Sequence, residues 1–213
     1  NAYRMSSLGE EAALANDPIN DSFWRLDMRR LGAEEIRDTI LSVSGTLNLK
    51  MYGPGVFPEI PAEVMAGQSV PGSGWGKSPP EEQARRSVYV HVKRSLLTPI
   101  LEGFDIAETD RSTPVRFATT QPTQALAMLN GSFLNQQAEI LARRLRREAG
   151  NRLASRVDRA LRLATTRPPT DAEVARGVAL VESLKANEGA SDDSALQTFC
   201  LVVLNLNEMI YVD

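Results

Sequence analysis

The chain has 213 residues, of which 42% are hydrophobic and 24% charged, and its formal net charge is −3. These values are ordinary for a soluble globular protein and leave the charge of any partner open. The single cysteine, Cys200, excludes an internal disulfide and any Cys-x-x-Cys motif for metal or haem attachment. No apolar run reaches the roughly 18–20 residues that span a bilayer. Asn1 opens the chain without a signal-peptide pattern, so we expect a processed chain or part of a longer one.

The first strong element is a helix that we expect over residues 31–45. Its apolar residues recur at helical spacing, glutamates occupy its first turn, and Gly45 suits its C-terminal cap. Before it, residues 1–15 have weak helical character. Residues 20–22 are a suitable cap for a short helix that carries Phe23, Trp24 and Leu26.

Residues 48–80 form a long loop rich in proline and glycine, in which no long regular element is expected. Such a loop is unusual inside a compact domain, so we expect it to be functional, partly mobile or pinned to the surface. Trp75, flanked by glycines, is the large side chain best placed to contact a ligand. The alternative is that Trp75 and Phe57 anchor the loop to the core.

Residues 86–94 predict a short β element. Alternation puts three valines on one face of this strand, and Tyr89, His91 and Lys93 on the other. With Arg94, these three residues are candidates for a binding surface around the only histidine. The sequence shows no specific partner for His91, so the alternative is a strand histidine without a chemical role.

The C-terminal half predicts a bundle of four or five helices with short connections. A short apolar helix is expected within residues 96–104, and Thr120 is a suitable N-cap for a helix that has Pro122 in its first turn. Longer helices are expected over residues 133–148 and 152–165.

Two further helices complete this bundle. Thr170 and Glu173 form a capping box for the first of them. Ser191 or Asp192 begins the last helix, which residues 205–213 finish. We therefore expect a mainly α fold in a single domain over residues 1–213, with 1–118 and 119–213 as its parts if it divides.

Five ordered motifs then become recognisable: residues 28–38, 86–94, 120–130, the Arg-Pro-Pro-Thr of 167–170, and 204–213. Together they resemble domain of unknown function 1553, the C-terminal domain of large proteins typical of planctomycetes and their relatives, over nearly the whole chain. Residues 1–7 resemble a point inside that domain, so its N-terminal portion is expected to be absent. Such proteins often carry a cytochrome c-like domain and a second planctomycete domain upstream. The resemblance therefore implies export to a periplasmic or extracellular location, with haem on an upstream domain and no cofactor in this chain. It brings no established reaction.

The acidic residues Glu102, Asp105, Glu108 and Asp110 lie within nine positions but match no calcium loop. Paired carboxylates of a glycosidase would need to converge at defined distances, and solvated acids on a loop are the simpler interpretation. No Gly-x-Ser-x-Gly or Walker-type motif occurs. We therefore assign no catalytic residue and no metal ligand.

The strongest charge feature is an arginine-rich segment, with ten arginines against four acids between residues 143 and 176. Arginine matches the geometry of phosphate, sulfate and carboxylate groups, so Arg143 and Arg147 are candidate binding residues. The alternative is a face on which these arginines pair with acids or cover apolar surface. The net acidity of the chain favours an acidic polysaccharide or a protein over nucleic acid.

Two functions remain. The first is a non-catalytic helical interaction module that packs against other domains of its own polypeptide or a neighbouring subunit. The second is part of an enzyme that acts on polysaccharide or is coupled to haem electron transfer, with His91, Trp75 and the acids lining a cleft shared with upstream domains. Clustering of these residues around a pocket would favour the second, and scatter would favour the first.

Overall fold

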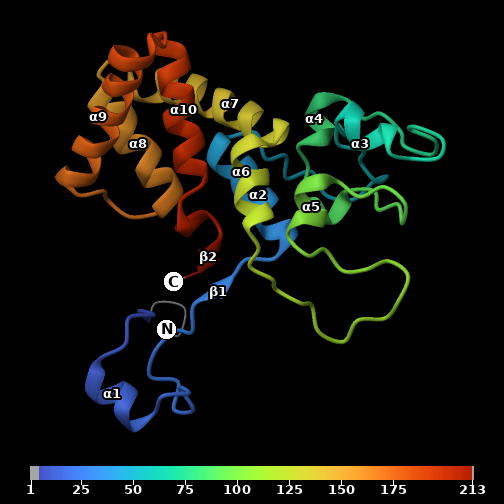
Figure 1. Cartoon of the computed structure of the whole chain (residues 1–213), viewed down its shortest axis with the longest axis horizontal. Helices are drawn as coiled ribbons and strands as arrows, with labels where there is room; N and C mark the ends of the chain where they lie inside the picture. The colour runs from blue at the N-terminus through green and yellow to red at the C-terminus, as the bar shows by residue number, and fades with distance from the viewer. Residues whose placement is uncertain (1–4, 213) are drawn as a thin grey trace.

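The computed structural model describes residues 5–212 and is mainly helical, which confirms the expected fold class. Four long helices form the C-terminal bundle: α7 Ser132–Ala149, α8 Leu153–Thr165, α9 Asp171–Glu188 and α10 Asp192–Leu204. Helix α10 packs against α7, α8 and α9, and α2 (Ala33–Ser44) packs against α7 (Figure 1). The core follows from the sequence pattern, because Leu134, Ala138, Leu141 and Leu145 form one buried stripe along α7.

The helix ends follow the predicted capping chemistry in most places. Thr170 and Glu173 form the capping box of α9, the Ser191 side chain caps α10, and Gly45 ends α2 with a φ of 85°. Helix α6 (Pro122–Asn130) differs by one residue from the prediction, because Gln121 rather than Thr120 is its N-cap residue.

The N-terminal segment projects from the body of the molecule (Figure 1). It contains one short helix, α1 (Glu11–Asn16), and the helix expected around residues 23–26 is not formed. Instead, the Asp17 carboxylate accepts hydrogen bonds from the N–H groups of Asp21 and Ser22, and Phe23 has a φ of 51°. These contacts stabilise a turn, whereas a helix would need a continuous series of backbone hydrogen bonds.

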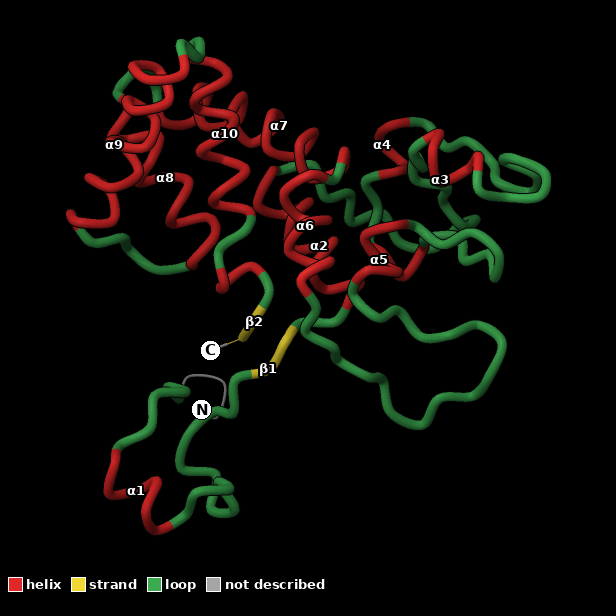
Figure 2. The backbone as a smooth tube through the Cα atoms, viewed as in Figure 1, coloured by secondary structure: helices red, strands yellow, loops and turns green. Residues whose placement is uncertain are grey.

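The C-terminal end of the described chain pairs with the segment just before α2 in a small antiparallel sheet, drawn as strands in Figure 2. Strand β1 (Arg29–Arg30) pairs with β2 (Tyr211–Val212), with Arg29 opposite Val212. The prediction that residues 205–213 finish the last helix was therefore wrong. The tail leaves α10 at Leu204, passes through the 3₁₀ turn η3 (Asn207–Met209) and returns to β1.

The loop lobe, residues 48–98, lies beside α2 and contains short helices α3 (Ala62–Ala66) and α4 (Pro80–Gln83), followed by α5 (Pro99–Gly103). The β element expected at 86–94 is reduced to isolated bridges between Val56 and Val90 and between Lys93 and Leu96. Residues Ser87–Tyr89 form the 3₁₀ turn η2, because backbone N–H groups bond back to carbonyls three residues earlier.

The predicted alternation of faces was consequently wrong in this segment. Val90 is buried, but Val88 and Val92 are 71% and 42% exposed. A 3₁₀ turn rotates successive side chains by a third of a turn each, so the valines cannot share one face. Within residues 5–212, no helix has both the length and the apolar character needed to cross a bilayer.

Candidate functional site

Two buried arginines attach the loop lobe to α2. Arg37 is 2% exposed and donates to the carbonyls of Arg85 (3.0 Å) and Gln83 (2.6 Å) and to Oγ of Ser87 (3.1 Å). Burial lowers the pKa of Arg37 to about 10, although neighbouring Asp38 works to raise it. The Asp38 carboxylate accepts hydrogen bonds from N–H and Oγ of Ser87, both at 2.7 Å. These contacts fix the start of η2 against α2.

Arg85 is fully buried and holds the loop over residues 50–54. Its guanidinium donates to the carbonyls of Tyr52 (2.5 Å), Lys50 (3.3 Å) and Pro54 (3.3 Å), and lies 3.9 Å from the centroid of the Tyr89 ring. The Tyr89 hydroxyl accepts a hydrogen bond from the N–H of Tyr52 at 2.8 Å. Tyr89, a predicted binding residue, therefore stabilises this loop.

Trp75 and His91 are brought together in the loop lobe. Both rings contact Phe57, with centroids 5.5 Å from Trp75 and 4.6 Å from His91, and they lie 5.9 Å from each other. The indole N–H of Trp75 donates to the carbonyl of Pro58 at 3.1 Å. This arrangement agrees with the alternative in which Trp75 and Phe57 anchor the loop, and it gives His91 aromatic neighbours rather than a catalytic acid or base.

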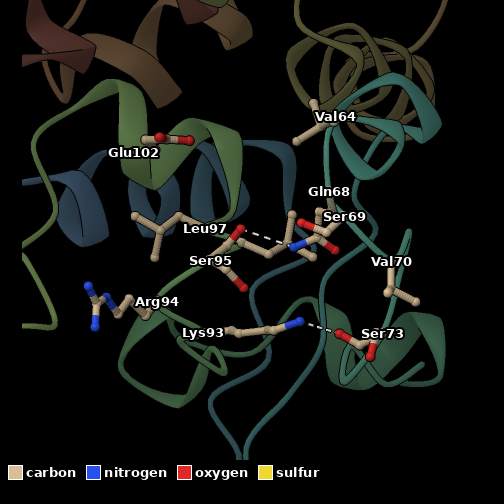
Figure 3. Close-up of a pocket in the computed structure, with 12 residues that line it drawn as sticks. Val64, Gln68, Ser69, Val70, Ser73, Lys93, Arg94, Ser95, Leu97 and Glu102 are labelled. Carbon is tan, nitrogen blue, oxygen red and sulfur yellow. Dashed lines mark hydrogen bonds between the residues drawn. The ribbon is translucent and has the colours of Figure 1, made fainter.

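A cavity of about 550 Å³, which Phe57, Trp75 and His91 do not line, lies between the 64–73 segment and the turn at 93–97 (Figure 3). Lys93 and Arg94 line it, and the Lys93 ammonium donates to the carbonyl of Ser73. Gln68 crosses from the opposite side and donates through Nε2 to the carbonyl of Ser95 at 3.0 Å. We call this hollow the 93–97 cavity. It contains two of the predicted binding residues.

A second cavity of about 410 Å³ adjoins it, and Leu97 and Glu102 line both. Two of its three acids, Asp105 and Glu108, form ion pairs with arginines. Asp105 forms an ion pair with Arg30 at 2.8 Å and accepts from the N–H of Thr119 at 2.8 Å. Burial works to raise the pKa of Asp105, but the Thr119 N–H and the Arg30 guanidinium outweigh burial, and the pKa lies below its ordinary value. The lowered pKa favours the charged form of Asp105 and makes it a poorer proton donor than an ordinary aspartate.

The arginine-rich segment lies elsewhere, on the C-terminal bundle, and most of its charges are neutralised. Arg143 pairs with Glu139 on its own helix, and Arg147 is an exposed residue of α7 outside the 93–97 cavity. Two pairs connect helices, Arg159 with Glu148 and Arg146 with Asp193. Arg144 with Glu148 and Arg162 with Asp158 pair within one helix, and Arg167, in the loop before α9, pairs with Glu173. The predicted binding residues are therefore divided between two separate surfaces.

Sequence reasoning missed the residues that organise the loop lobe, namely Arg30, Arg37, Asp38 and Arg85. Three of them lie in the motif at 28–38, and Arg85 directly precedes the motif at 86–94. One signal was present: Arg37 follows Ile36 on the face of α2 that carries Ile40, where a surface arginine is out of place. No cluster of three or more His, Cys, Asp or Glu side chains suited to a metal ion occurs among residues 5–212.

The sequence comparisons add one finding. A family model described as "PSD1: Protein of unknown function (DUF1553)" matches residues 1–181. The match contains four of the five motifs, and the motif at 204–213 lies outside it. No curated protein and no solved structure matches the chain.

Proposed function

The chain belongs to the DUF1553 family, and on this premise we propose that it is a non-catalytic helical interaction module of a larger exported protein. Its partner is another domain of the same polypeptide or a neighbouring subunit. The docking surface that we propose is formed by residues 49–52 together with η2. We name it the 49–52/88 surface.

The observation that carries this proposal is the role of Arg85. A fully buried guanidinium donates to the carbonyls of Lys50, Tyr52 and Pro54, whose side chains are exposed. It also pairs with the Glu82 carboxylate at 3.5 Å. Burying a charge is costly unless its hydrogen bonds are satisfied, so the arrangement is a strong constraint on this loop.

Most side chains that this framework presents are apolar or aromatic, and the exception, Lys50, pairs with Glu82 at 2.7 Å. Leu49, Met51, Tyr52 and Val88 are 67%, 54%, 78% and 71% exposed. The Tyr89 hydroxyl joins the two segments, since it accepts from the N–H of Tyr52 and contacts the Met51 sulfur at 3.7 Å. Exposed apolar side chains grouped on an ordered surface are typical of a protein interaction site.

The polar residues that hold the loops support the same proposal from the other direction. Arg30, Arg37, Asp38, Arg85 and Asp105 all bind backbone groups or each other. Catalytic groups need free donors, acceptors or nucleophilic atoms aimed at a substrate. In the described part of the chain these residues are committed to holding loops.

One observation favours the alternative, an enzyme site shared with upstream domains. Trp75 and His91 contact each other, and Lys93, two residues beyond His91, lines the 93–97 cavity. Against this, Asp105 and Glu108 lie on the adjoining cavity, and each pairs with an arginine. The contact of His91 with Phe57 and Trp75 leaves it without a carboxylate partner among residues 5–212. We therefore prefer the module.

Hydrogen–deuterium exchange tests the docking role. The isolated 213-residue chain is compared with the same residues inside the full-length gene product. We expect the amides of residues 49–54 and 86–90 to exchange at least about tenfold more slowly in the full-length protein, because docking removes local opening. A Met51→Glu variant should abolish this protection, and Val202→Glu, an exposed apolar position on α10, should not.

Identical exchange in the two proteins would refute the docking proposal. Slower exchange that depends on the concentration of the isolated chain, with a dimer in sedimentation velocity, would instead identify a second copy as the partner. The mass of the full-length gene product with its prosthetic groups tests the remaining parts of the proposal, which are export and a haem domain upstream.

A further inference from the structure

The first turn of α7 has backbone N–H groups without acceptors. The N–H groups of Ser132, Phe133 and Leu134 have no intrahelical partner, and no carbonyl or side chain among residues 5–212 accepts from them. The same turn contains no acidic side chain. The positive end of the dipole of this 18-residue helix is therefore not compensated by the protein, and it favours a negative charge.

The missing cap of α7 has a steric cause. Gly131 is the N-cap residue of α7 and also ends α6, with its N–H bonded to the carbonyl of Ala127 at 2.9 Å. A Cβ at Gly131 would lie 2.5 Å from the Ala127 oxygen. Serine, threonine and aspartate, which cap helices through their side chains, therefore do not fit at this position. The tight turn between α6 and α7 leaves the first N–H groups of α7 without a side-chain acceptor.

A cavity of about 140 Å³ lies at this end of α7, and we name it the 98/133 cavity. The first three residues of α7 line it, together with residues at the starts of α3 and α5. Most of these residues are apolar, among them Pro61, Val64, Pro99 and Ile100. Apolar cavities of about 150 Å³ are large enough to bind benzene, so a branched aliphatic side chain fits this volume.

One polar side chain in the wall of this cavity is buried without a partner. Thr98 lines the cavity and is 6% exposed, and no group among the described residues forms a hydrogen bond with its Oγ1. Thr98 is the N-cap residue of α5, but its hydroxyl caps nothing. A buried hydroxyl without a hydrogen bond costs free energy. Independently of α7, Thr98 therefore indicates a polar ligand atom in the cavity.

The cavity is also lined by a carboxylate, that of Glu59. This side chain is exposed and forms no ion pair or hydrogen bond with another residue of the 5–212 range. The N–H of Glu59 donates to Oε1 of Gln83 at 3.0 Å, which holds the backbone at this position. The 98/133 cavity therefore combines a positive helix end, a free carboxylate and an apolar interior.

We propose that the 98/133 cavity binds a small aliphatic α-amino acid such as valine. The α-carboxylate accepts hydrogen bonds from the free N–H groups of α7 and from the Thr98 hydroxyl. The α-ammonium lies against the Glu59 carboxylate, and the branched side chain enters the apolar interior. The inference goes beyond the docking role, and the cavity shares no residue with the 49–52/88 surface.

The charges that line the cavity select a zwitterion over a simple anion or cation. A carboxylic acid without an amine would be attracted by the end of α7 but repelled by Glu59. An amine without a carboxylate would pair with Glu59 and leave the N–H groups of α7 and the Thr98 hydroxyl unbonded. An α-amino acid satisfies both, because its two charges are separated by a single carbon atom.

The test is a titration of the 213-residue chain followed by ¹H–¹⁵N correlation spectra. Four probes are compared: L-valine, glycine, isovalerate and isobutylamine. We expect L-valine to shift the amides of residues 98, 100 and 132–134 with a Kd of about 1 mM or tighter. Glycine, which lacks the side chain, and isobutylamine, which lacks the carboxylate, should each bind at least about tenfold more weakly. Isovalerate lacks only the ammonium and should bind about fivefold more weakly, because Glu59 is exposed.

Two variants and a matched control localise the binding. Thr98→Val keeps the shape of the side chain and should weaken valine binding about tenfold, the loss expected for one hydrogen bond to a charged group. The same change removes an unbonded buried hydroxyl, so the Tm of the free protein should stay the same or rise. Glu59→Gln should weaken valine binding about fivefold without weakening that of isovalerate. Glu63→Gln removes an exposed acid of α3 that does not line the cavity, and it should leave the affinity for valine within about twofold.

Three outcomes would overturn the proposal. The first is the absence of shifts at residues 98, 100 and 132–134 with L-valine. The second is binding of isobutylamine or glycine as tight as that of valine, which would remove the role of the α7 N–H groups or of the apolar interior. The third is a folded Thr98→Val variant with unchanged affinity, which would show that the unbonded hydroxyl does not contact the ligand.

Discussion

Replacement of Arg85 by methionine is the sharpest test of how the loop lobe is held. The change removes a guanidinium that is 0% exposed and donates at 2.5 Å to the Tyr52 carbonyl and at 3.3 Å to the carbonyls of Lys50 and Pro54. Methionine keeps much of the side-chain volume, so the loss comes mainly from the carbonyls left without donors and from the lost ion pair with Glu82 at 3.5 Å. The side chain of Arg86, next in the sequence, is half exposed and serves as the control.

The magnitude follows from these contacts. A hydrogen bond to a charged group contributes about 1.5–3 kcal/mol, and weaker bonds about 0.5–1 kcal/mol each. The bond to Tyr52 belongs to the first class and the two longer bonds to the second. Water can reach part of this loop, and the loss of a buried charge offsets some of the cost. We expect Arg85→Met to lower the free energy of unfolding by about 3 kcal/mol.

Arg86→Met removes a surface contact of 3.7 Å to Asp38 and should cost less than about 1 kcal/mol. The measurement is urea unfolding followed by far-UV circular dichroism, together with thermal melting. For a chain of this size, 3 kcal/mol corresponds to a lower Tm by roughly 6–12 °C. Equal losses in the two variants, or a loss below about 1 kcal/mol for Arg85→Met, would refute the structural role assigned to Arg85.

Three further predictions concern the C-terminal bundle. The pKa of Glu173 is lowered to about 2 by Arg167 and by the Thr170 cap. The stability that this carboxylate contributes should therefore be present above pH 4.5 and be lost as the pH falls towards 2. The variant Glu173→Gln should flatten that part of a curve of unfolding free energy against pH. A Cβ on Gly177 would lie 2.6 Å from Cγ1 of Val157. Gly177→Ala should therefore destabilise the protein by about 1–2 kcal/mol in urea unfolding, despite the better helix propensity of alanine. A stabilised variant would contradict this packing. Cys200 is buried, and burial raises the pKa of its thiol to about 12; Ellman's reagent should react with it only in denaturant, and rapid reaction of the native protein would contradict its burial.

The helical bundle was predictable because its information is local. The stripe Leu134, Ala138, Leu141 and Leu145 repeats at helical spacing, and Thr170 with Glu173 marks a helix start within four residues. Hydrogen bonds in a helix and its caps join residues three or four positions apart, so a short window of sequence contains both partners.

The segment at 86–94 was predicted wrongly for the complementary reason. Its valines and Tyr89 have the composition of a strand, but a strand also needs a neighbour along its length. Val56 pairs with Val90 at a single bridge, and the Asp38 carboxylate captures the N–H of Ser87. The group that took this N–H from a possible strand partner belongs to a side chain 49 positions away in sequence, and no local pattern reveals it.

The sequence by itself therefore determined the fold class, the bundle helices and the family resemblance. The tertiary structure decided what the motif residues do. Arg37 and Arg85 could be seen as charges, but only folding shows that their partners are backbone carbonyls of distant loops. Every residue has a backbone carbonyl whatever its side chain, so the sequence does not show which carbonyls will accept these hydrogen bonds. The contact of Trp75 with His91 and the hydrogen bond from Lys93 to the Ser73 carbonyl depend on the same long-range placement.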